Sequence, residues 1–226
     1  MFFLRTFRMV VKITPNLFGK SRNESISNEL DKKLANKVVI NVGLCICLYD
    51  ITHIGDSHII PGDGSAHMKV TFRYVVFCPS KEETIEGKVK LCDNEGIHVS
   101  LTFFDDILIP PMHMQCPSKF NEVQSTWIWM YKVDQESDPV EMVVEKGDDI
   151  RFKVVDLEFN DTTPKPADQT GGAILDTSKD TPFRIIGKIS ESGLGLPSWW
   201  NQETEEGEEE EDAEMGEEAE DDEEDV

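Results

Sequence analysis

The 226-residue sequence lacks the signatures of membrane-spanning and secreted proteins. It contains no apolar run long enough to cross a bilayer. Residues 1–11 are too short and, with Arg5 and Arg8, too basic to form the apolar part of a secretory signal. The cysteines, at positions 45, 47, 78, 92 and 116, are few and odd in number. We therefore expect no membrane partner, a reducing compartment, and buried or half-buried free thiols.

Signatures of catalysis are also missing. The chain has no Walker loop, no dinucleotide-binding fingerprint and no nucleophile elbow. The adjacent carboxylates Asp105 and Asp106 are typical of a solvated loop. His53, His58 and His67 fall in expected loops, without a nucleophile and an orienting acid at recognisable spacing, so they are interpreted as surface residues. The sequence thus predicts a non-catalytic protein with no cofactor.

Two cysteines leave a metal site open as an alternative. Cys45 and Cys47 are two residues apart, so in a regular strand both side chains would lie on one face. A closed zinc site needs four ligands, and no second Cys or His pair stands at ligand spacing. A packed pair of thiols is therefore the favoured interpretation, and zinc is the alternative.

Positive charge is missing from the C-terminal end. The formal net charge is −23, and residues 201–226 contain 17 Asp and Glu but no Lys or Arg. Residues 1–200 therefore hold 28 acids against 22 bases and carry a net charge of only −6. A run of like charges repels itself and buries nothing, so residues 201–226 are predicted to be a disordered acidic tail.

The N-terminal part predicts a helix between strands. Residues 1–13 are rich in Phe, Val and Ile and favour a strand. Ser21 and Glu24 have the spacing of a capping box. Apolar residues then recur every four positions on one face of a helix that ends near residue 36; they are Ile26, Leu30 and Leu34.

Two further strands complete the expected N-terminal unit. The β-branched and apolar run at 38–49 predicts a strand that is buried on both faces. A turn signal follows at 61–64, and residues 69–76 then alternate between apolar and polar, with Phe72 on the inward face. Residues 1–79 are therefore expected to form a small α/β unit whose helix covers one face of a sheet.

Short alternating strands follow the break at Pro79 and Ser80. We expect them near residues 85–91, 97–101, 127–131, 150–154 and 183–189. Five short strands with few helical segments predict a small closed barrel, such as an OB-fold, over residues 80–200. Residues 160–180, rich in Thr, Pro, Asp and Gly, are expected to interrupt this barrel as a flexible surface loop. The predicted fold class is α+β.

Basic residues on the outward faces of three barrel strands form a candidate nucleic-acid-binding face. They are Lys88, Lys90, Arg151, Lys153, Arg184 and Lys188. A sheet face that carries several Lys and Arg suits a phosphate backbone. The alternative is that these charges only keep an exposed face soluble, and the sequence leaves both interpretations open.

The four tryptophans occur in two pairs. Trp127 and Trp129 point the same way in a strand, so a core position is favoured, and stacking on bases is the alternative. Trp199 and Trp200 stand between the barrel and the acidic tail. We expect these large aromatic side chains to close the barrel or to dock on a partner.

Several strings of the sequence resemble the larger stalk subunit of RNA polymerase III, a family related to the seventh subunit of polymerase II and to its archaeal counterpart. The strings are KLANKVV (33–39), NVGLCIC (41–47), PGDG (61–64), FRYVVF (72–77), GIHVSL (96–101), FFDDILIPP (103–111), ISESGLGL (189–196) and SWW (198–200). The resemblance runs over nearly all of residues 1–200.

The resemblance implies an RNP-like tip domain at 1–79 followed by an S1-type OB barrel. In the family, this non-catalytic subunit pairs with a small helical partner to form a stalk. The tip domain plugs into the polymerase core, and the barrel lies near the RNA exit path. The resemblance further implies nuclear localisation, support for initiation at genes of small untranslated RNAs, and contact with nascent RNA or initiation factors. It carries over no catalytic or metal residue.

A free S1-type RNA-binding protein, acting in RNA processing or translation, is the alternative function. The two hypotheses differ in what the isolated chain should do. A stalk subunit without its partner should expose apolar surface on the tip domain. A free RNA binder should be a stable monomer.

Overall fold

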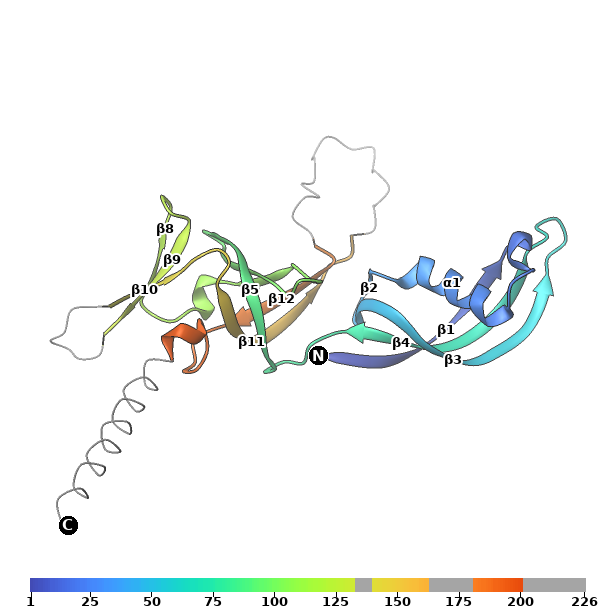
Figure 1. Ribbon diagram of the computed structural model, residues 1–226, viewed down its shortest axis with the longest axis horizontal. Helices are drawn as coiled ribbons and strands as arrows, with labels where there is room; N and C mark the ends of the chain where they lie inside the picture. Colours follow the sequence, from blue (N-terminus) through green and yellow to red (C-terminus); the bar gives the residue numbers. More distant parts are fainter. Residues whose placement is uncertain (133–139, 163–180, 201–226) are drawn as a thin grey trace, which may run out of the picture. The chain divides into compact units, whose positions relative to one another are not determined.

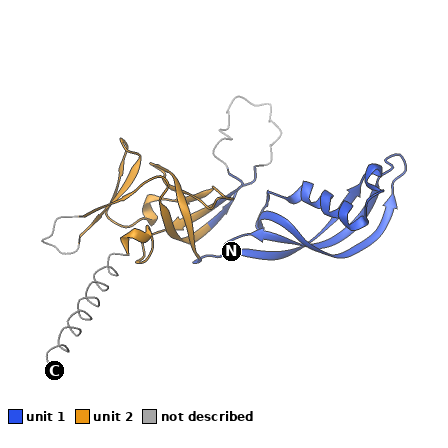
Figure 2. Cartoon of the chain, viewed as in Figure 1, with its two compact units in different colours: residues 1–83, 157–184 blue, residues 84–156, 185–226 orange. Residues whose placement is uncertain are grey.

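The computed structural model describes residues 1–132, 140–162 and 181–200 (Figure 1). Its residues group into two compact units, one of residues 1–83 and 157–184 and the other of residues 84–156 and 185–226 (Figure 2). The predicted acidic tail at 201–226 lies outside the described residues, and so does the expected loop at 160–180 apart from its first three residues. The expected domain boundary at Pro79 and Ser80 stays a prediction.

The first unit contains a four-stranded antiparallel sheet in the order β1-β4-β3-β2. Its elements are β1 (Phe2–Ile13), the 3-10 turn η1 (Pro15–Leu17), α1 (Arg22–Leu34), β2 (Lys37–Val39), β3 (Gly43–Ile59) and β4 (Ala66–Phe77). Helix α1 covers one face of this sheet (Figure 1). The predicted α/β arrangement of the N-terminal part is therefore confirmed.

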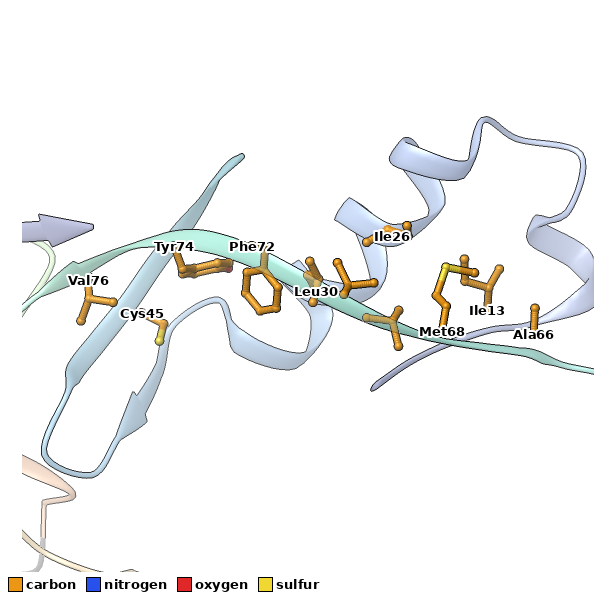
Figure 3. Packing of buried hydrophobic residues seen from close by; sticks show 11 residues of the cluster. Ile13, Ile26, Leu30, Cys45, Ala66, Met68, Phe72, Tyr74 and Val76 are labelled. Atoms are coloured by element: carbon orange, nitrogen blue, oxygen red, sulfur yellow. The ribbon is translucent and has the colours of Figure 1, made fainter. Parts of the chain in front are cut away.

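The predicted helix start and its buried face are both confirmed. The hydroxyl of Ser21 accepts a hydrogen bond from the Glu24 amide at 3.3 Å, which satisfies one of the free donors in the first turn. Ile26 and Leu30 are fully buried. They face the alternating inward side chains of β4, among them Phe72, which is also fully buried (Figure 3).

The predicted strand at 38–49 is wrong in its bounds and its burial. The chain turns between β2 and β3, with Asn41 at φ 61° and Gly43 at φ 122°. A Cβ atom on Gly43 would lie 2.3 Å from the Phe77 carbonyl oxygen, so glycine is required at this close approach. Beyond the turn only one face of β3 is covered, and Tyr49 is 59% exposed.

Irregular pairing bends β3 and separates the two cysteines. Cys45 pairs with Val76, whereas Cys47 pairs with Val75, because an extra residue is inserted between them. Cys45 is therefore buried and Cys47 exposed, and the prediction that both lie on one face is wrong. Three further register shifts follow along β3, and both β3 and β4 curve strongly in Figure 1.

The chain beyond residue 83 contains a closed barrel in the strand order β11-β12-β7-β6-β5. Its strands are β5 (Thr84–Asp93), β6 (Gly96–Ser100), β7 (Ile107–Ile109), β11 (Asp149–Phe159) and β12 (Phe183–Lys188). The predicted closed barrel of five short strands is confirmed. One member differs, because the three-residue β7 takes the place expected for residues 127–131 and pairs with β12 in parallel.

The strand at 127–131 belongs instead to a separate sheet in the order β10-β9-β8. These strands are β8 (Ser118–Asn121), β9 (Thr126–Tyr131) and β10 (Val140–Val144), and the single turns η2 (Pro111–His113) and η3 (Pro197–Trp199) complete the described elements. No helix in the described part of the chain has both the length and the apolar character needed to cross a membrane.

The tryptophans join this small sheet to its surroundings. Trp127 is buried, as predicted, and its indole N–H donates a hydrogen bond of 3.0 Å to the Asp93 carbonyl oxygen. The Trp129 ring lies 5.3 Å from the Trp199 ring, centre to centre. The Trp200 indole donates to the Leu194 carbonyl oxygen at 3.1 Å. Both members of the second pair thus pack against the chain around the barrel.

Candidate nucleic-acid interface

All six predicted basic residues lie on barrel strands and point away from the barrel interior. The alternation that predicted this is visible in their neighbours, since Val89, Ile150, Phe152 and Ile185 are buried. Lys88, Lys90 and Arg151 are exposed, and Lys153, Arg184 and Lys188 are half-buried. We call the outer surface that these six side chains and their neighbours form the barrel face.

On β5 and β11 the bases alternate with acids across the strand pair. The register places Lys88 opposite Asp149 and Arg151 opposite Glu86. Two nitrogens of the Arg151 guanidinium donate to Glu86 Oε1, at 2.9 and 2.7 Å. Lys88 Nζ lies 3.4 Å from Asp149 Oδ1. This part of the barrel face is therefore a ladder of opposite charges, which stabilises cross-strand pairing.

Lys90 is held by the loop that follows β6. Its Nζ donates to Asp105 Oδ2 at 2.8 Å, and Ser100 donates a second hydrogen bond to the same carboxylate. The hydrogen bond from Lys90 lowers the pKa of Asp105, the hydroxyl of Ser100 lowers it further, and the pKa of Lys90 is raised in return. Asp105 thus lies in an exposed loop, as expected, but it has a specific basic partner.

One carboxylate engages two lysines at the other end of the barrel face. Glu191 accepts from Lys153 at 3.0 Å and from Lys188 at 2.8 Å. Lys188 makes the larger contribution to lowering the pKa of Glu191, and Lys153 the next. The two lysines keep only 23% and 19% of their side-chain surfaces exposed. They are therefore less open to a ligand than the other bases.

The acids on the barrel face compete with a phosphate backbone for the bases. Sequence reasoning found the bases but missed the carboxylates Glu86, Asp105, Asp149 and Glu191, which pair with five of them. A phosphate has to replace one of these carboxylates at each of those five bases. Exposed ion pairs contribute only about 0–1 kcal/mol each, so this exchange is energetically accessible.

The histidines at 53, 58 and 67 are not in loops. His53 and His58 lie on β3 and His67 on β4, and all three line a hollow of about 470 Å³ on the sheet of the first unit. The prediction of loop positions failed because β3 runs on to Ile59, well past the expected strand end. Among the described residues, no group of three or more His, Cys, Asp or Glu is arranged to hold a metal ion.

Two family models match the chain and together cover most of residues 8–200. The model described as "RNA polymerase III subunit Rpc25" matches residues 83–200. The model described as "SHS2 domain found in N terminus of Rpb7p/Rpc25p/MJ0397" matches residues 8–64. The first match contains the whole barrel and the small sheet, and the second contains α1, β2, β3 and the second half of β1, and ends before β4.

Full-length relatives agree with these models. The chain is 48% identical to DNA-directed RNA polymerase III subunit RPC8 of Bos taurus, over 88% of this chain and 98% of the relative. It is 34% identical to the subunit of the same name in Saccharomyces cerevisiae, over 88% of this chain and all of that protein. It also resembles DNA-directed RNA polymerase II subunit RPB7 of Saccharomyces cerevisiae, at 31% identity over 45% of this chain and 60% of that protein. The chain belongs to the RNA polymerase III subunit Rpc25 family.

Proposed function

We propose that this chain is a non-catalytic stalk subunit of nuclear RNA polymerase III that supports initiation of transcription of small untranslated RNAs. The observation that carries the proposal is the 48% identity to the bovine polymerase III subunit over nearly the whole length of that protein. The alternative of a free S1-type RNA-binding protein has no support from the relatives, which are named as polymerase subunits.

The proposal assigns a role to each part of the chain. Residues 1–79 would be the RNP-like tip domain that plugs into the polymerase core and contacts a small helical partner subunit. Residues 80–200 would be the S1-type OB barrel, and residues 201–226 the acidic tail. Support for the tip domain comes from the match to the SHS2 model, and support for the barrel comes from its closed ring of five strands.

Exposed apolar side chains on the first unit favour a role in assembly. Phe2, Phe3 and Leu4 follow one another at the start of β1 and are all exposed by 40% or more. Consecutive exposed apolar residues are costly in water and are typical of surfaces that a partner covers. A stalk subunit without its partner is expected to present such a surface.

The barrel face would contact nascent RNA through its bases. Its six basic side chains point outward, and the ion pairs of Lys88, Lys90 and Arg151 are of the exposed kind that phosphates can replace. The contact would be independent of base identity, because it uses charge rather than hydrogen bonds to base edges.

Affinity purification of the tagged full-length chain from nuclear extract tests the proposal. We expect one small partner and the polymerase III core subunits in amounts equal to the chain, identified by mass spectrometry. A chain in which Phe2, Phe3 and Leu4 are replaced by Ser should recover less of them, and Val123→Ser, at a residue that is 94% exposed in a turn, is the matched control. Recovery of the chain alone, or with ribosomes, would contradict the proposal.

A further inference from the structure

The outer face of the sheet in the first unit, opposite α1, carries basic side chains. Phe72 of β4 packs in the core on the α1 side (Figure 3). Lys69 and Thr71 have the other strand parity and therefore face away from the helix. Arg8 of β1 and His53 of β3 are both register partners of Thr71, so one row of side chains crosses three neighbouring strands. These residues line the hollow of about 470 Å³.

Carboxylates pair with the outward bases on both sides of this row along β4. Towards one end of the strand, Arg73 Nε donates to Asp50 Oδ1 at 2.8 Å. Towards the other end, Lys12 Nζ donates to Asp63 Oδ1 at 2.8 Å, and His67 Nε2 lies 2.9 Å from the same carboxylate. At both ends of the face, positive charge is therefore already compensated.

Between these ion pairs lie exposed bases whose side chains make no hydrogen bond or ion pair with any described residue. They are Arg8, Lys69, His53 and His58. The guanidinium and the ammonium carry full charge at neutral pH, and each imidazole adds an N–H donor. Among the described residues that line the hollow, Asp56 supplies the one carboxylate. The middle of the face therefore keeps positive charge for an anionic ligand.

Strand pairing sets the spacing of these bases. Lys69 lies two residues from Thr71 on β4, so it is a diagonal neighbour of Arg8 across the strand pair. Diagonal neighbours on one face of a sheet lie about 7–8 Å apart. In an extended peptide, side chains on one side recur every 6.8 Å or about that distance. Carboxylates at alternate positions of an extended peptide can therefore reach Arg8 and Lys69 in turn.

The apolar part of the lining favours a peptide over nucleic acid. Val10 and Ile60 line the hollow beside the cations and are 53% and 49% exposed. The methylene groups of acidic side chains can pack on these two residues while the carboxylates reach the bases. Proteins that bind single-stranded nucleic acid present large aromatic side chains on which the bases stack. The described lining of the hollow includes no Phe, Tyr or Trp.

We propose that this hollow binds an extended acidic segment of a partner protein, with carboxylates at alternate positions that contact Arg8 and Lys69. The intervening side chains of the segment would point to solvent. The site would therefore select the spacing of negative charge rather than a particular sequence. The inference does not rest on the proposed function, because it follows from one surface of the first unit and the chemistry that matches it.

Fluorescence anisotropy of a labelled synthetic peptide, titrated with the full-length chain, tests the proposal. In this peptide glutamate alternates with threonine. At low salt we expect saturable binding that is weakened about fivefold in Arg8→Glu, and more when Lys69→Glu is added. Asp56→Asn removes the carboxylate from the lining and should tighten binding about twofold. A misfolded variant would not produce this gain.

Two controls separate the site from general charge attraction. Arg5→Glu makes the same charge change on β1, but Arg5 has the strand parity of Phe7 and Met9, which pack on the core side. It should leave the affinity within about twofold of the wild-type value. A peptide of the same composition with its glutamates in one block should bind about threefold more weakly, because adjacent side chains of an extended chain point to opposite sides.

Three outcomes would overturn the proposal. One is absent binding of the alternating peptide, or binding that is unchanged in Arg8→Glu. Another is equal affinity for the alternating and the block peptide, which would mean that the hollow does not select charge spacing. The third is a single-stranded RNA that depends on Arg8 and Lys69 and binds more tightly than the peptide, which would assign the hollow to nucleic acid.

Discussion

The barrel face and the hollow of the first unit are both basic, yet they differ in how their charges are compensated. On the barrel, Arg151 has Glu86, Lys90 has Asp105, and Glu191 holds two lysines at once. In the hollow, Arg8 and Lys69 have no such partner within the described residues. The number of bases along a strand therefore does not tell which of two surfaces binds anions better. The acids on neighbouring strands determine how much positive charge remains without a carboxylate partner.

The comparison depends on the register of β4, which separates the core side of the sheet from the hollow. Phe72→Ala should lower the free energy of unfolding of the first unit by about 3–5 kcal/mol, because the ring is fully buried and its removal leaves a cavity. Denaturant unfolding followed by circular dichroism measures this change. Thr71→Ala, one position away on the other side, should cost within about 0.5 kcal/mol. A loss below about 1 kcal/mol for Phe72→Ala would mean that the strand faces are assigned wrongly.

Thiol labelling sharpens the contrast between the two sides of the sheet. At pH 8, Cys47 should react with iodoacetamide at least about a hundredfold faster than Cys45, because burial blocks access to Cys45 and raises the pKa of its thiol, which reduces the reactive thiolate. Cys92 is the internal control in the barrel, since burial raises its pKa to about 11 and it should also react slowly. Peptide mass spectrometry over time gives the rates. Equal rates for Cys45 and Cys47 would rule out the bulge between them.

Removing an acid from the barrel face tests whether the carboxylates that pair with the bases limit the affinity of the barrel for RNA. Glu191→Gln removes one carboxylate partner from Lys153 and from Lys188, so it should tighten binding of a single-stranded RNA by about threefold to tenfold at low salt and steepen the salt dependence. Fluorescence anisotropy of the full-length chain, purified with its bound partners, measures both. Glu122→Gln removes an acid from the turn between β8 and β9 and should change little. An unchanged affinity for Glu191→Gln would argue against these lysines as RNA contacts.

Deleting residues 201–226 should have the smallest effect on RNA binding at the barrel. Removal of this segment leaves the carboxylates that pair with the barrel bases in place, so the RNA affinity should change by less than about twofold at low salt. The same anisotropy titration provides the measurement. Tightening as large as that of Glu191→Gln would mean that the segment competes with RNA for the bases of the barrel.

Prediction from sequence succeeded where a local pattern encodes burial. The helix α1 was predicted from Ser21, Glu24 and a four-residue apolar repeat, and the outward placement of the barrel bases from strict alternation. Prediction from sequence failed where irregular strand pairing interrupts the two-residue alternation of side chains. The bulge after Cys45 moves Cys47 to the other face, and β7 is too short, at three residues, to show any alternation.

The sequence by itself determined the family, the α1 helix with its cap, the inward positions of β4, and the charge asymmetry between residues 1–200 and 201–226. These follow from side-chain chemistry and from neighbours a few positions away. Only the tertiary structure decided which acid meets which base. Glu86 and Arg151 are 65 positions apart, and Arg8, His53 and Lys69 reach one hollow from three strands. Charges interact over a few ångströms of space, and strand pairing brings together residues whose separation along the chain carries no trace of that contact.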